Sequence, residues 1–268
     1  MTAPATDIAA TSPAAVSAPV PDPWQTWQQQ TPARIALGRS GISLPTREVL
    51  QFAADHANAR DAIHTPLDLP DLLAQLGADG WPVVSVRSQA NSRADYLRRP
   101  DWGRRLHEDS AADLAALQAA PVDVMFVVGD GLSALAVQRH AAPMLAACRS
   151  ALDGRLSLGP VVVAQQARVA LADEIGQLLR ARLVVMLIGE RPGLSSPDSL
   201  GLYMTYAPQV SCTDAQRNCI SNIRPAGLSY AAAAGRFAWL ALEAQRIGQT
   251  GVGLKDLSEP QPQQIGNK

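Results

Sequence analysis

The sequence predicts an α/β protein, with a doubly wound, Rossmann-like parallel sheet preceded by a smaller, mainly helical N-terminal region. After Pro121, short apolar runs alternate with longer stretches of helical period, which is typical of parallel strands covered on both faces by helices. Before Pro121, most apolar residues recur at three- and four-residue spacing, which favours helices. A length of 268 residues with 47% apolar side chains is enough for a sizeable core.

Composition shifts divide the chain into four expected segments. Residues 1–23 are rich in Ala, Pro, Thr and Ser, contain no Lys or Arg and show no period, so we expect a disordered extension. Residues 24–120 form the mainly helical region, and residues 121–257 form the Rossmann-like domain. For residues 258–268 we expect a flexible tail.

In the mainly helical region we expect four helices and one strand. Trp24 and Trp27 share a helical face before Pro32, and Gly77 ends a short helix. In chain order the elements are a helical turn at Trp24 and Trp27, a helix over 46–63 with Thr46 as candidate N-cap, a helix over 69–76, a strand over 83–86, and a helix over 102–119 with Asp101 as candidate N-cap.

After Pro121, four apolar runs predict strands over 122–128, 160–164, 183–188 and 202–206. The stretches with helical period predict helices over 132–147, 169–182 and 230–247. Sheets of this type bind ligands at the carboxyl ends of their strands. The glycine-containing loops at those ends, residues 129–133 and 189–196, are therefore the expected binding loops.

Composition excludes several classes of function. A net charge of −1, from 23 basic and 24 acidic side chains, excludes a nucleic-acid binder or a membrane binder that acts by bulk positive charge. No run of 18 apolar residues is present, so we expect no membrane span. The three cysteines form no disulfide framework, a pattern that suits a reducing cytosol, and the four histidines show no metal-binding spacing.

The segment 129–134 fits the G-x-G-x-x-A dinucleotide pattern. The NAD-binding version needs an acidic residue at the end of the next strand, where this chain has Gln165 and Gln166. The alternative is a tight strand-to-helix turn in which Asp130 or Ser133 caps the helix. A third alternative is that the backbone amides of this segment bind another ligand or a partner.

Glu190 directly follows a buried strand, where a carboxylate is costly unless it is paired or hydrogen-bonded. Either nearby amides or an arginine satisfy it, or it accepts from donors on a ligand. Cys219, beside apolar residues, is by default inert core. The arginine-rich segment 96–105 is by default a solvated or salt-bridged face, and alternatively an interface. No catalytic constellation is evident, which favours a binding component over a complete enzyme.

Seven segments together resemble the small (light) subunit of adenosylcobalamin-dependent ethanolamine ammonia-lyase, over about residues 31–255. Their order and separations, rather than any single motif, make the resemblance specific. The segments are TPARI and GRSG (31–35, 38–41), DH (55–56), YLRRPD and GRRL (96–101, 103–106), GDGLS (129–133), ARV and DEIG (167–169, 173–176), GERPGL (189–194) and RNCISNI (217–223).

The resemblance implies a subunit of a radical enzyme that converts ethanolamine to acetaldehyde and ammonia. The catalytic residues are then expected on a large TIM-barrel subunit and none on this chain. Adenosylcobalamin would lie between the two kinds of subunit, in an assembly of six large and six small chains. The positions implied for cofactor contact are Val169, Glu190 and Cys219, and no metal ligand is expected from this chain.

Two further expectations accompany the resemblance. No histidine here has Asp two residues before it, so the D-x-H-x-x-G motif that replaces the cofactor's own base is absent and base-on binding is expected. Residues 1–23 lack the amphipathic stripe that directs some relatives into a bacterial microcompartment, so the location is either the cytoplasm or such a compartment. A standalone Rossmann-type NAD-dependent oxidoreductase and a purely structural subunit are the alternatives.

Overall fold

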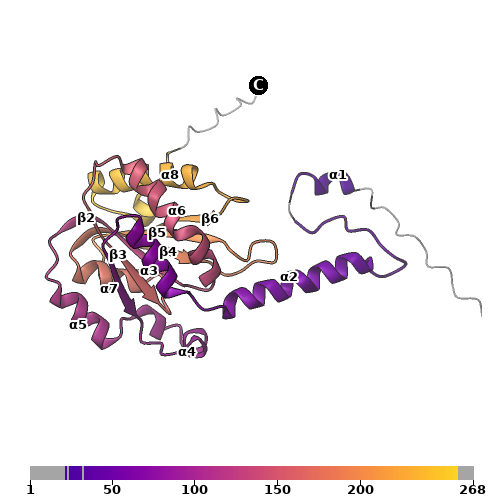
Figure 1. The fold of residues 1–268 in the computed structure, drawn as a ribbon. Helices are drawn as coiled ribbons and strands as arrows, with labels where there is room; N and C mark the ends of the chain where they lie inside the picture. Colours follow the sequence, from indigo (N-terminus) through magenta and orange to yellow (C-terminus); the bar gives the residue numbers. More distant parts are fainter. Residues whose placement is uncertain (1–21, 23, 32, 259–268) are drawn as a thin grey trace, which may run out of the picture. The chain divides into compact units, whose positions relative to one another are not determined.

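The structure, a computed structural model, describes residues 22, 24–31 and 33–258 (Figure 1). By its contacts the chain divides into two units, Met1–His56 and Ala57–Lys268. The domain boundaries expected from composition stay predictions. The expected disordered extension and flexible tail fall outside the described residues, apart from Asp22 and Ser258.

The first unit contains α1 (Gln25–Gln28) and the beginning of α2 (Thr46–His64). Arg34, in the segment between them, forms an ion pair with Asp55 of α2 and lies 5.3 Å over the ring of Phe52. Both helices were predicted. Thr46 is the first helical residue of α2, however, and not the residue that precedes it.

The second unit is built on one six-stranded sheet in the order β1-β3-β2-β4-β5-β6. Strands β1 to β4 are mutually parallel, whereas β5 runs antiparallel to β4 and β6 antiparallel to β5. The strands are β1 (Val83–Arg87), β2 (Val122–Gly129), β3 (Leu158–Gln165), β4 (Ala181–Gly189), β5 (Leu200–Tyr206) and β6 (Arg217–Ile223).

The expectation of a parallel sheet is therefore right for β2, β3 and β4 and wrong for β5, and β1, expected within the helical region, joins the same sheet as a parallel edge strand. A parallel neighbour for β4 would need a crossover connection, usually a helix, but residues 190–199 contain none. The sequence did not predict β6 at all. Its buried and exposed residues are mixed, as on an edge strand, so it lacks the continuous apolar run that marks the central strands.

Helices cover both faces of this sheet (Figure 1). Val124, Phe126 and Val128 of β2 pack in the cluster that includes α3, α6 and α8, whereas Met125 and Val127 pack in the cluster that includes α5 and α7. Burial on both faces explains the uninterrupted apolar runs. The helices are α3 (Leu69–Ala78), α5 (Glu108–Ala116), α6 (Ala134–Leu152), α7 (Leu171–Leu178) and α8 (Tyr230–Ile247).

The single helix expected over 102–119 is wrong. The chain forms a 3₁₀ helix, η1 (Trp102–Arg104), then an extended stretch in which Leu106 bridges to Ser88, and only then α5. The N-cap of α5 is His107, and the Asp101 carboxylate instead binds Arg99 at 2.6 Å. Pairing beside β1 interrupts the helix, which local spacing cannot show. A short helix, α4 (Arg93–Arg98), was also not predicted.

Two predicted helices begin later than expected, and this affects the site. Ser133 is the N-cap of α6, which begins at Ala134, and its hydroxyl accepts from the Ala136 N–H at 3.2 Å. Helix α7 is confined to Leu171–Leu178, so Val169 lies in the turn before it. Arg180, with φ of 57°, then turns the chain into β4.

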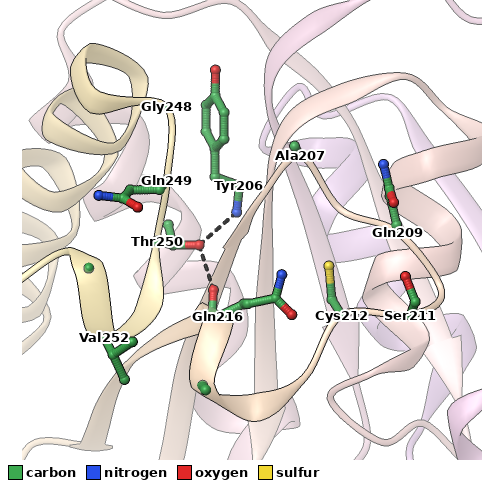
Figure 2. Close-up of a pocket in the computed structure, with 12 residues that line it drawn as sticks. Tyr206, Ala207, Gln209, Ser211, Cys212, Gln216, Gly248, Gln249, Thr250 and Val252 are labelled. Carbon is green, nitrogen blue, oxygen red and sulfur yellow. Dashed lines mark hydrogen bonds between the residues drawn. The ribbon is translucent and has the colours of Figure 1, made fainter.

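At the amino-terminal edge of the parallel strands, side chains tie β5, β6 and the segment after α8 together. The Thr250 hydroxyl accepts from the Tyr206 N–H at 2.9 Å and donates to the Gln216 carbonyl at 2.6 Å (Figure 2). Gln216 ends a 3₁₀ helix, η2 (Asp214–Gln216), and Thr250 precedes another, η3 (Gly251–Gly253).

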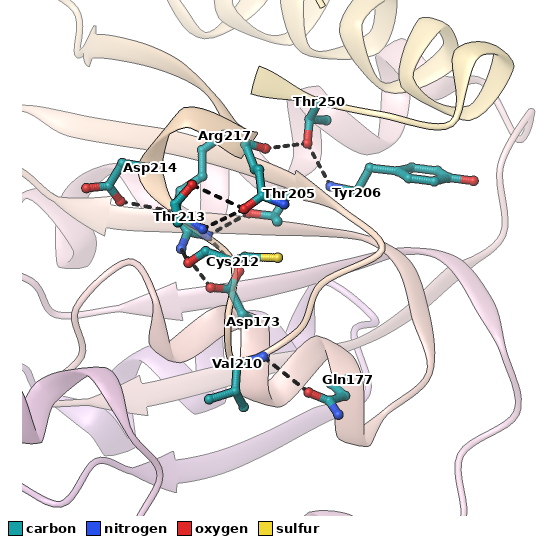
Figure 3. A network of polar contacts seen from close by, with 11 residues as sticks. Asp173, Gln177, Thr205, Tyr206, Val210, Cys212, Thr213, Asp214, Arg217 and Thr250 are labelled. Carbon is teal, nitrogen blue, oxygen red and sulfur yellow. Dashed lines mark hydrogen bonds and ion pairs between the residues drawn. The ribbon is translucent and has the colours of Figure 1, made fainter. Parts of the chain in front are cut away.

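A buried ion pair joins β6 to α7 next to this edge (Figure 3). The Arg217 guanidinium donates to the two carboxylate oxygens of Asp173 at 2.6 and 2.8 Å, to the Thr205 hydroxyl at 2.9 Å and to the Cys212 carbonyl at 3.0 Å. The Arg217 and Asp173 side chains are only 3% and 1% exposed. Because both charges are desolvated, each depends on the other.

Replacing Asp173 by Asn should lower the free energy of unfolding by about 3–5 kcal/mol, because the buried Arg217 charge loses its counter-ion. Denaturant unfolding followed by circular dichroism measures this. The matched control, Asp101→Asn, removes an exposed carboxylate that bonds Arg99 and should leave the midpoint unchanged. Equal midpoints for the two variants would contradict a stabilising role for the pair.

Candidate functional site

A cavity of about 340 Å³ opens at the carboxyl ends of β2 and β4. Both expected binding loops, 129–133 and 189–196, contribute to it. The residues that line it are Tyr96, Gly131, Leu132, Arg168, Val169, Ile188, Gly189, Glu190, Arg191 and Tyr203. Val169 and Glu190, two of the three predicted site residues, therefore lie in one cavity.

The floor of this cavity is a close contact between two glycine turns. The Leu132 N–H donates to the Gly189 carbonyl at 2.9 Å, and Gly131 has a φ of +58°. A Cβ at Gly131 would lie 2.2 Å from the Gly189 carbonyl oxygen, so only glycine fits. The interpretation of 129–134 as a tight turn capped by Ser133 is confirmed.

Asp130 holds the loop that carries Val169. Its carboxylate is buried and accepts from the backbone N–H groups of Gln166 and Ala167, each at 2.9 Å. Burial raises the pKa of Asp130, and these two hydrogen bonds oppose the rise. Asp130 does not cap α6, and β3 ends at Gln165, so the NAD alternative lacks its ribose-binding acid.

Tyr96 also supports the loop that carries Val169. Its side chain is fully buried, its hydroxyl donates to the Ala167 carbonyl at 3.2 Å, and burial raises its pKa to about 12. Arg168 stacks 4.2 Å over the ring, and Arg93 lies 4.7 Å from it. The expectation that segment 96–105 is a solvated or salt-bridged face is right at Arg99 and Arg105, which form ion pairs with Asp101 and Glu174, and wrong at the buried Tyr96.

Glu190 lies half-buried at the rim of the cavity, where three groups of the chain donate hydrogen bonds to it. Its carboxylate accepts from the Ser199 hydroxyl, from the Ser221 hydroxyl at 2.6 Å and from the Asn222 N–H at 3.3 Å. One of these donors is a backbone amide and none is an arginine. The expectation that nearby amides or an arginine satisfy Glu190 is therefore confirmed for the amide only. Since a carboxylate has about four acceptor positions, it can still accept from a ligand.

Cys219 is exposed on β6, so its interpretation as inert core is wrong. It pairs with Tyr203 of β5, which lines the cavity, but Cys219 itself does not. Desolvation of the thiol, together with the nearby Glu190 charge, raises the pKa of Cys219. The side chain therefore stays a neutral thiol near pH 7 and is a contact surface rather than a nucleophile.

Sequence reasoning missed Tyr96, Arg168, Arg191 and Tyr203 as cavity residues. Arg168 directly precedes Val169, and Arg191 directly follows Glu190. Because both arginines are neighbours of predicted site residues, the sequence could have indicated them as cavity residues. Tyr96 comes from far away in the chain: its carbonyl accepts from Arg168 across 72 positions. No local pattern signals such a contact.

A larger cavity of about 500 Å³ lies around Tyr206, Cys212 and Thr250 (Figure 2). It opens at the amino-terminal edge of the parallel strands, away from the end where α/β sheets bind ligands. Within the described part of the chain, no cluster of His, Cys, Asp or Glu could hold a metal ion, and no helix is long and apolar enough to cross a membrane.

Comparison with known proteins points to one family. The family model described as "Ethanolamine ammonia-lyase light chain (EutC)" matches residues 21–255. The ethanolamine ammonia-lyase small subunit of Ralstonia nicotianae is 55% identical over 242 residues, which cover 89% of this chain and 90% of the relative. The small subunit from Bradyrhizobium diazoefficiens is 55% identical, covering 88% and 92%, and that from Pseudomonas putida is 57% identical, covering 90% of each.

Replacing Gly131 by Ala should lower the free energy of unfolding by more than about 1 kcal/mol, because the residue is left-handed and its Cβ would collide with the Gly189 carbonyl. The matched control is Gly235→Ala in α8, where a Cβ meets nothing within 4 Å. It should raise the stability by about 0.5–1 kcal/mol. Thermal unfolding measures both, and an unchanged Gly131→Ala variant would contradict the close contact.

Proposed function

The chain belongs to the ethanolamine ammonia-lyase light-chain family, and on this basis we propose that it binds adenosylcobalamin jointly with a large subunit. As a lyase subunit of this family, it contributes binding and orientation. We place the catalytic residues on the large TIM-barrel subunit. The observation that carries the proposal is the cavity at the carboxyl ends of β2 and β4, which brings Val169 and Glu190 together.

The chemistry of the cavity fits the cofactor. A corrin is a broad, mostly apolar ring fringed with amides, and it needs apolar contact together with a few placed donors and acceptors. Leu132, Val169 and Ile188 provide the apolar contact. The Glu190 carboxylate at the rim accepts from an amide N–H. A buried, unpartnered Arg168 Nε beside the cavity is a donor still without an acceptor.

The size of the cavity supports a shared site. About 340 Å³ is near the lower end for pockets that enclose drug-sized molecules, and adenosylcobalamin is considerably larger. This chain can therefore cover only part of the cofactor, and a second surface must cover the rest. The chemistry that the cofactor supplies when bound is radical formation by homolysis of its cobalt–carbon bond.

Each of the three site residues has a distinct role in this proposal. Val169 presents its backbone and isopropyl group from the turn before α7, which Asp130 and Tyr96 hold in place. Glu190 accepts a hydrogen bond from the cofactor. Cys219 extends the contact along β6 with a small thiol. Base-on binding is proposed because none of the four histidines lies in a D-x-H-x-x-G motif.

Exposed apolar side chains support a permanent partner. In the first unit they recur within a short part of the chain, and exposed apolar side chains that together form one patch mark interaction sites. They are Trp24, Trp27, Ile35, Ile42, Leu44, Val49, Leu50 and Phe52. We propose the large subunit as that partner, in an assembly of six large and six small chains, either in the cytoplasm or inside a bacterial microcompartment.

Mixing this chain with the large subunit should give acetaldehyde from ethanolamine only when adenosylcobalamin is added. The small chain alone, or the large chain alone, should give none, because neither completes the cofactor site. Co-purification followed by an enzyme-coupled acetaldehyde assay tests this. A stable complex that stays inactive with the cofactor would contradict the proposal, and so would activity of this chain by itself.

Replacing Glu190 by Gln should weaken cobalamin binding to the complex by about 10- to 150-fold, because one charge-assisted hydrogen bond contributes about 1.5–3 kcal/mol. Equilibrium dialysis of the cofactor against the complex measures it. Glu243→Gln, which removes an exposed carboxylate paired with Arg246 on α8, is the matched control. Unchanged affinity in Glu190→Gln would favour a purely structural subunit.

A further inference from the structure

The charges around the cavity do not balance. Three charged residues line it, namely Arg168, Glu190 and Arg191. Hydroxyl and amide donors hold Glu190, and no cation is among them. Among the residues that the structure describes, neither Arg168 nor Arg191 forms an ion pair with a carboxylate. The cavity therefore carries two guanidinium groups against one carboxylate.

Arg168 is held in one position rather than free in solvent. Its guanidinium stacks on Tyr96 and donates from Nη2 to the Tyr96 carbonyl at 3.1 Å. Its backbone N–H donates to the Gly103 carbonyl at 2.7 Å, and a Cβ at Gly103 would come within 2.8 Å of the Arg168 side chain. A guanidinium held in this way loses little freedom when it binds a ligand.

One donor of this group has no acceptor. The Arg168 Nε is buried and makes no hydrogen bond within the described chain. A buried donor left unpaired is costly, more so on a charged group, which makes the position one where an acceptor is expected. The nearby Asp130 does not fill this role, because its oxygens accept from Gln166 and Ala167.

The geometry points to an anion as the missing acceptor. A guanidinium presents a planar fork of N–H donors that matches paired oxygens, as in a phosphate group. If the proposed function holds, the ligand of this cavity is adenosylcobalamin, whose amide side chains are neutral. Its one anionic group is the phosphodiester that joins the corrin to the nucleotide base.

We infer that Arg168, assisted by Arg191, forms an anion subsite for the phosphodiester group of the cofactor. Arg168 provides the fixed, half-buried contact, and Arg191, which is exposed, adds a weaker and screened attraction. The inference rests on the proposed function and deepens it, because it assigns an orientation to the cofactor in the cavity. The nucleotide side of the cofactor would face Arg168.

The test compares two ligands on the complex of this chain with its large subunit. Adenosylcobinamide retains the corrin and the adenosyl group but lacks the phosphodiester and the nucleotide. Arg168→Gln should weaken binding of adenosylcobalamin by about 10- to 100-fold. It should change binding of adenosylcobinamide less than about twofold, since the phosphodiester is absent. Arg191→Gln should show the same selectivity with a smaller loss.

The controls separate a binding role from a structural one. Arg168→Lys keeps the charge without the fork and should recover part of the lost affinity. Arg182→Gln removes an exposed arginine paired with Asp123 and should affect neither ligand. Equal losses of both ligands in Arg168→Gln would overturn the inference, because Arg168 would then act only by shaping the Val169 loop. Unchanged affinity for both ligands would also overturn it.

A third arm separates the cofactor's phosphodiester from free phosphate. Inorganic phosphate is added to the wild-type and Arg168→Gln complexes while cobalamin binding is measured. Phosphate should weaken cobalamin binding in the wild type and not in the variant. Arg168-dependent stabilisation by phosphate without that competition would assign the subsite to a free anion and overturn the inference. If the wild-type complex bound neither corrin ligand, the proposed function itself would be wrong.

Discussion

The buried carboxylate of Asp130 is the interaction on which the geometry of the candidate site depends. Asp130 begins the strand-to-helix turn after β2, yet its two oxygens accept from Gln166 and Ala167 in the turn after β3. Burying this charge is unfavourable, and the two N–H donors and the positive charge of Arg93 offset the penalty. In exchange, the turns at the ends of two parallel strands keep a fixed separation, which places Arg168 and Val169 beside Gly131.

The mixed direction of the sheet explains how Glu190 at the rim finds hydrogen-bond donors within the chain. Since β5 reverses direction and β6 reverses it again, β6 runs the same way as β4. Its final residues therefore reach the level of Glu190, where Ser221 and Asn222 donate to it. An all-parallel sheet with a crossover helix after β4 would not place these donors there. The same register places Cys219 farther back along the strand, beside Tyr203.

The cavity contains a carboxylate, Glu190, and a guanidinium, Arg168, which differ in how many of their hydrogen bonds the chain itself satisfies. Glu190 has its own donors and would need a ligand only for additional hydrogen bonds. Arg168 has an aromatic ring and a carbonyl, but its Nε has no acceptor in the described chain. A protein tolerates such a donor most readily where a ligand or partner completes it. The contrast explains why a carboxylate that looked unusual in the sequence is locally stable, whereas an arginine that looked ordinary is not satisfied.

The sequence by itself determined the central strands and both glycine loops. The apolar runs at 122–128 and 183–188, alternating with stretches of helical period, predicted strands buried on both faces, and Gly131 and Gly189 marked the turns at their ends. The place of Glu190 directly after a buried strand already marked it as a candidate, whereas only the resemblance pointed to Val169 and gave Cys219 a role in cofactor contact. Tertiary structure alone decided the direction of β5, the existence of β6 and the burial of Tyr96. These features depend on pairing between segments far apart in the chain, and local spacing reports only which face of an element is apolar, not what covers it.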